Sequence, residues 1–140
     1  MSVINPDFAE ENFTYSFGSI NYNYSPPKLK SVKLEQKNFK KIVKVVLVLE
    51  NLKTQKWREI PKLECLYGGD QANPIKEEKS EPVKKVIRNA FANHEADYSD
   101  EAKYYPSYLS VTKEMRIFGY QWKGVFNVVL IDLHHDIHGR

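Results

Sequence analysis

Residues 113–140 read KEMRIFGYQWKGVFNVVLIDLHHDIHGR, and this stretch decides the fold. It contains two apolar runs, 115–121 and 125–133, separated by a short turn, which is the pattern of a β-hairpin. The second run is apolar on both faces, with positions 125, 129, 131 and 133 expected on one side and 126, 128 and 130 on the other. Such a strand is typical of the centre of a sheet that is covered on both sides.

Upstream segments predict the elements around this hairpin. A third strand is expected at 108–111, and the alternation of large and small side chains over 13–17 predicts an early strand. A helical spacing of apolar residues is seen in Phe39, Ile42, Val43, Val46 and Leu49. The β-branched run 45–48 would also suit a buried strand. A helix is favoured because Lys44 would otherwise lie inside a core strand. A second helix, with Ser80 as its N-cap, is expected to carry its apolar face over 83–94.

Together these segments predict an α+β fold, in which an antiparallel sheet of four to five strands packs against two helices. The length of 140 residues is that of one domain. Within this single domain, 1–140, we distinguish an N-terminal strand and loop region at 1–33, a helical region at 34–94 and a β-hairpin region at 104–140.

Composition narrows the class of protein. Hydrophobic residues make up 41% of the chain and charged residues 28%, which are values of an ordinary globular protein. The single cysteine, Cys65, cannot form an internal disulfide. No apolar run approaches the roughly 18 residues of a membrane-spanning helix, and the N-terminus lacks a signal-peptide pattern. We therefore expect a cytoplasmic protein that makes no membrane contact.

Positive charge is concentrated in residues 28–62, where eleven Lys and Arg stand against three Glu, a local net charge of +8. A surplus of this size attracts a polyanion such as RNA or DNA. The alternative is a solvated, lysine-rich helix face without a nucleic-acid partner. The residues assigned to nucleic-acid binding are Lys40, Lys41, Lys44, Lys113 and Lys123.

Three histidines, His134, His135 and His138, follow the last predicted strand. Imidazoles this close together suggest zinc binding or general acid–base chemistry near neutral pH. The spacing is a weak zinc signature, because His134 and His138 converge on a helix but diverge on a strand. Neither a metal nor another cofactor is therefore expected, and a solvated tail is the alternative for all three histidines.

Arg116 shares one face of a predicted strand with Phe118 and Tyr120, because the three occupy alternate positions. Arg116 and the three histidines form the predicted catalytic set. The arginine would bind phosphate and neutralise developing charge, and a histidine would act as general acid or base. RNA cleavage of this kind needs no metal. The alternative places Phe118 and Tyr120 in the core and lets Arg116 reach solvent.

Two resemblances accompany these motifs. Trp57-Arg58-Glu59-Ile60, followed by Arg116-Ile117-x-Gly119-Tyr120, Val125-Phe126-x-Val128 and Ile131-Asp132, resembles a group of small uncharacterised proteins from bacteria, plasmids and phages. The order of elements also resembles the RelE/ParE toxin superfamily: predicted helices are followed by Arg116 and Tyr120, a short turn, an apolar strand and a closing histidine. That similarity implies cleavage of ribosome-bound mRNA without a metal, or gyrase as a target. It matches Arg116 to the arginine that opens the penultimate strand, and His134 or His135 to the basic residue after the last strand.

The expected function is that of a nucleic-acid-directed protein of a mobile element or toxin–antitoxin locus, in its most specific form a metal-independent RelE-like endoribonuclease. The alternative is a non-enzymatic phage or plasmid protein that inhibits a host nuclease or defence system. Such an inhibitor needs no catalytic residues and uses charged, tyrosine-rich surfaces. The partner would be RNA in the first case and a protein, such as an antitoxin or a host nuclease, in the second. Exposed sheet edges favour a homodimer.

Overall fold

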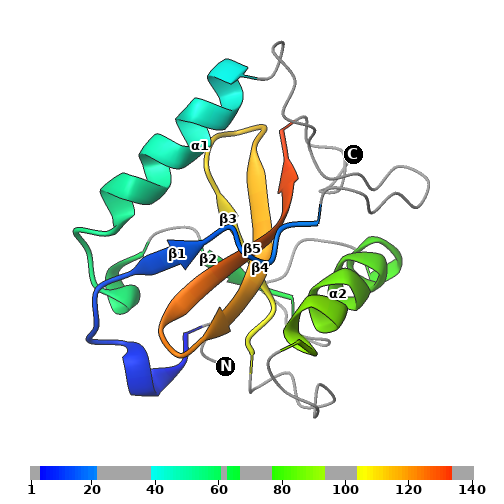
Figure 1. Cartoon of the computed structure of the whole chain (residues 1–140), viewed down its shortest axis with the longest axis horizontal. Helices are drawn as coiled ribbons and strands as arrows, with labels where there is room; N and C mark the ends of the chain where they lie inside the picture. The colour runs from blue at the N-terminus through cyan, green and yellow to red at the C-terminus, as the bar shows by residue number, and fades with distance from the viewer. Residues whose placement is uncertain (1–3, 22–38, 61–62, 67–76, 94–103, 134–140) are drawn as a thin grey trace.

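A computed structural model describes residues 4–21, 39–60, 63–66, 77–93 and 104–133 of the chain. The predicted α+β class is confirmed, since two helices pack against one five-stranded sheet (Figure 1). The elements are β1 (Thr14–Ser16), α1 (Phe39–Leu52), β2 (Leu63–Cys65), α2 (Glu77–Phe91), β3 (Ser107–Ser110), β4 (Arg116–Trp122) and β5 (Val125–Asp132), with short 3₁₀ helices at Pro6–Phe8 and Trp57–Glu59.

The sheet has the order β1-β5-β4-β3-β2. Strands β2 to β5 pair antiparallel, as expected. The pairing of β1 with β5 is parallel, which the prediction of a purely antiparallel sheet missed. The edge strand β2 was also not predicted, because three residues are too short for a visible alternation.

The hairpin β4–β5 is closed by the two residues Lys123 and Gly124, whose φ angles of 51° and 81° both lie in the left-handed region. Such a turn matches the twist of the strands it joins. As predicted, β5 is central and buried on both faces, with α1 on one side and α2 on the other (Figure 1). The sheet that contains this hairpin is therefore the middle layer of three, between α1 and α2.

A β-bulge in β5 changes the expected distribution of side chains. Phe118 pairs with Leu130, but the next residue of β4, Gly119, pairs with Val128, so Val129 is an extra residue. An extra residue inverts the alternation of a strand. Phe126 and Val128 therefore share the α1 face with residues 131 and 133, whereas the sequence predicted opposite faces.

Helix α1 is present where it was predicted, but the face that it buries is different. The core-facing residues are Val45, Leu49 and Leu52, whereas Phe39 and Val43, which the sequence placed in the core, are exposed. Its apolar residues cover a wider arc of the helix than one buried face needs, so their spacing does not select a single buried face.

Helix α2 begins at Glu77, three residues before the predicted N-cap Ser80. Its buried residues Val83, Val86, Ile87 and Phe91 pack on the second face of the sheet. There they meet Phe118, Tyr120 and Leu130, so the prediction that Phe118 and Tyr120 share one face is consistent with the structure.

Candidate functional site

Arg116, the central residue of the predicted catalytic set, opens β4 and lies opposite Asp132 in the register of the hairpin. Its Nη1 donates hydrogen bonds to the main-chain oxygens of Thr112, Lys113 and Met115, the last two at 3.1 Å. All three acceptors belong to the turn that leads into β4. The guanidinium therefore stabilises its own turn, and only part of the side chain is exposed.

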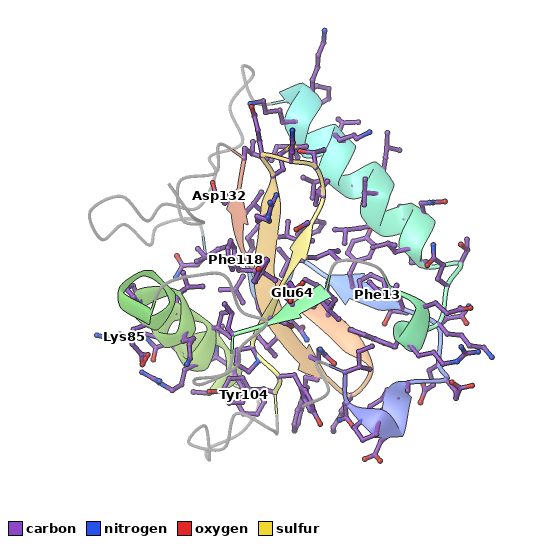
Figure 2. All side chains as sticks on the ribbon, turned by 180° about the vertical axis from the view of Figure 1, so that it is seen from behind. Phe13, Glu64, Lys85, Tyr104, Phe118 and Asp132 are labelled. Atoms are coloured by element: carbon purple, nitrogen blue, oxygen red, sulfur yellow. The ribbon has the colours of Figure 1, made fainter. Side chains whose placement is uncertain are left out.

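The surroundings of Arg116 are polar and largely buried. Asp132 is only 3% exposed. Burial raises the pKa of Tyr108, the negative charge of Glu64 raises it further, and the guanidinium of Arg116 lowers it. The Nε of Arg116 is buried and has no hydrogen-bond partner in the part of the chain that the structure describes. Figure 2 places Asp132 at one end of the sheet and Tyr104 towards the other, with Phe118 between them.

Arg116 and Lys123, which the sequence assigned to phosphate and nucleic-acid binding, lie at opposite ends of β4. Arg116 is the first residue of β4, whereas Lys123 follows its last residue, Trp122. Seven residues of extended strand span about 23 Å. Lys123 instead lies over the ring of Trp122, with 5.5 Å between its Nζ and the ring centroid. Arg116 and Lys123 are therefore too far apart along the strand to contact the same phosphate group.

The predicted histidines, His134, His135 and His138, lie outside the described residues. The strand that leads to them, β5, ends at Asp132, which pairs with Arg116 of β4 in the register of the hairpin. Among the residues that the structure describes, no group of three His, Cys, Asp or Glu side chains could hold a metal ion.

The predicted nucleic-acid-binding lysines fall into separate places. Lys40 and Lys44 are exposed on α1. Lys41, on the same helix, is partly buried, and its Nζ lies 4.0 Å from a carboxylate oxygen of Glu114. Lys113 is exposed in the turn before β4. Of the predicted lysines, Lys40 and Lys44 are the two that form a pair of exposed cations on one element.

An exposed apolar stripe on α1, made of Phe39, Val43 and Leu47, is the feature that sequence analysis missed. The three side chains are 65%, 36% and 60% exposed. Residues four apart lie on one face of a helix, so the three form a single ridge. Residues two apart lie about 200° apart, so Val43 and Leu47 face away from the buried Val45 and Leu49.

The lysines border this apolar stripe on one side only. Lys40 follows Phe39 and Lys44 follows Val43, each rotated by about 100° around the helix axis. On the other side, Ile42 and Val46 are partly buried. One feature of the sequence indicates this surface, because α1 has more apolar residues than a single buried face accommodates.

Together these features describe an α+β protein with an apolar and cationic helix face and a structurally engaged Arg116. The family model described as Uncharacterised protein UU032 matches residues 11–140, so the chain belongs to that family. Neither a curated protein nor a solved structure matches the chain. In the part of the chain that the structure describes, no helix combines the length and apolarity needed to cross a membrane.

Proposed function

We propose that this protein acts by binding another macromolecule through the outer face of α1, and that it is a non-enzymatic interaction protein. The observation that carries this proposal is the exposed apolar stripe Phe39, Val43 and Leu47. Large apolar side chains that stand together on a surface are typical of sites where a partner binds. A stripe of three on one helix is more than the scattered exposure found on any protein.

The environment of Arg116 supports a binding role over a catalytic one. A catalytic arginine has to meet a developing charge on the substrate. The Nη1 of Arg116 instead bonds three main-chain oxygens of its own turn. Its neighbour Asp132 is buried and would repel a phosphate. These contacts favour a role of Arg116 in stability.

Site-specific photo-crosslinking in cells tests the proposal. A benzophenone side chain at Val43 should yield an adduct of one defined mass, because this position lies in the apolar stripe. The matched control carries the same group at Asn89, an exposed position on α2. Adducts at neither position, or the same adducts at both, would contradict a binding surface on α1.

A nucleic-acid-directed function is the second candidate, and the exposed pair Lys40 and Lys44 favours it. In its most specific form the protein is a metal-independent endoribonuclease of a mobile element or toxin–antitoxin locus. Under this candidate, the double variant Lys40→Glu/Lys44→Glu weakens binding of a labelled RNA and flattens its salt dependence. Cleavage of that RNA in the presence of EDTA, abolished by His134→Ala, would establish the enzyme. Absence of both binding and cleavage would refute this candidate.

A further inference from the structure

We infer that the outer face of α1 receives an amphipathic helix of a protein partner, one that carries carboxylates along a single flank of its apolar stripe. The inference rests on the proposed function and names the chemistry of the partner. It follows from the shape of the exposed stripe and from the one-sided position of the lysines beside it.

The shape of the surface matches a helix. Phe39, Val43 and Leu47 follow the four-residue spacing of the ridges through which two helices interlock. The ridge extends over about 12 Å, because eight residues separate its ends. Two turns of a partner helix cover that length, and helix α1 itself, with 14 residues, offers about 21 Å. A docked helix would bury all three side chains in one groove.

The charges beside the stripe select the partner. Lys40 and Lys44 are exposed on one flank, whereas the other flank is formed by the partly buried Ile42 and Val46. That second flank ends at Glu50, whose carboxylate already contacts the Tyr15 hydroxyl and the Lys53 ammonium. A complementary helix therefore carries Glu or Asp on the lysine side and apolar side chains on the other. Because both lysines lie on the same flank, this arrangement also fixes the direction in which the partner helix runs.

Other occupants fit this face less well. The phosphates of RNA would pair with the lysines, but two of the three stripe residues, Val43 and Leu47, offer no aromatic ring on which a base could stack. In an antiparallel pair of two α1 helices, Lys44 of one copy would approach Lys44 of the other, because this residue lies near the middle of the helix. Like charges in that position disfavour a second copy as occupant.

Two designed peptides test the inference by fluorescence anisotropy. Both are labelled 18-residue helices with leucines four residues apart, and they differ only in carrying glutamates or lysines beside the leucines on one flank. Wild-type protein should bind the glutamate peptide at least tenfold more tightly than the lysine peptide. The double variant Lys40→Glu/Lys44→Glu should reverse that preference, and Leu47→Asp should weaken binding of the preferred peptide at least tenfold.

All variants change exposed side chains, so their melting temperatures should equal that of the wild type and serve as folding controls. Equal binding of the two peptides, or binding of neither, overturns the inference. It is also overturned if RNA or vesicles with anionic lipid bind to this face, or if the protein forms a dimer that Leu47→Asp dissociates. A crosslink at position 43 without a preference for the glutamate peptide would leave the proposed function standing and remove only this inference.

Discussion

Replacing Gly119 by alanine tests how closely the two central strands approach each other at the bulge. A Cβ atom on Gly119 would lie 2.0 Å from the main-chain oxygen of Asn127, 2.9 Å from its carbonyl carbon and 3.2 Å from the Cα of Val128. All three atoms are backbone atoms of β5, so no side chain can rotate away. Relief of the closest contact to 3.4 Å requires a movement of about 1.4 Å between β4 and β5.

The expected cost of this substitution is large. Overpacking a core typically costs about 1–3 kcal/mol, and backbone atoms that cannot yield place Gly119→Ala at about 3 kcal/mol or more. For a chain of this size such a loss lowers the melting temperature by about 10 °C. The strand pairs on both sides of the bulge would have to separate, so the loss includes hydrogen bonds of the sheet as well as packing.

Urea unfolding followed by circular dichroism measures this loss. Gly18→Ala is the matched control, because its nearest contact is a side-chain atom, the Oγ of Ser16 at 3.2 Å, and we expect it to change the free energy of unfolding by about 0.5 kcal/mol or less. A Gly119→Ala variant that unfolds within 0.5 kcal/mol of the wild type, roughly the effect of an ordinary surface change, would refute the described approach of the strands.

Three further predictions concern single side chains. Trp57→Phe removes the hydrogen bond from the indole Nε1 to the main-chain oxygen of Gly124 (3.0 Å), and thermal unfolding should reveal a loss of about 2 kcal/mol. Arg116→Ala should destabilise by about 1.5–3 kcal/mol because the carbonyl oxygens of Thr112 and Lys113 lose a charged donor, and unchanged stability would argue against the structural role of this arginine. Burial, and then the carboxylate of Glu50, raise the pKa of Tyr15 from its ordinary value of 10.0 to about 12, so its contribution to stability is present below pH 10 and is lost as the pH rises towards 12. Unfolding of wild type and Tyr15→Phe at pH 9 and pH 12 should show a smaller loss for the variant, and parallel losses would contradict this assignment.

The sequence predicted the central hairpin correctly because two independent signals agree there. The apolar runs on either side of Lys123-Gly124 predicted both strands, and the turn residues predicted where the chain reverses. The faces of β5 were predicted wrongly from Leu130 onwards, because a bulge depends on how two strands meet and leaves no mark in the alternation. Gly119, which permits that close approach, was the one visible hint.

The candidate site was harder to predict than the fold. The sequence indicated that Arg116 was polar and at a strand end, but the acceptors of its hydrogen bonds lie in a turn whose geometry is set by tertiary structure. The outer face of α1 was missed for a different reason. Hydrophobic spacing is read as a guide to the core, and a helix with two apolar faces gives no sign of which one stays exposed.

The parallel pairing of β1 with β5 has a consequence for the synthesis of this protein. Thr14 pairs with Val125, a residue made 111 positions later. At about 5–20 residues per second, a ribosome needs roughly 6–22 s to supply the second of these residues after the first. Meanwhile the emerging N-terminal segment can already bond to Gln55 and Trp57 through the main chain of Phe13 and Glu11. We therefore expect an early, partly assembled form that waits for the last strand, and the rate at which the finished sheet appears should follow translation rather than diffusion.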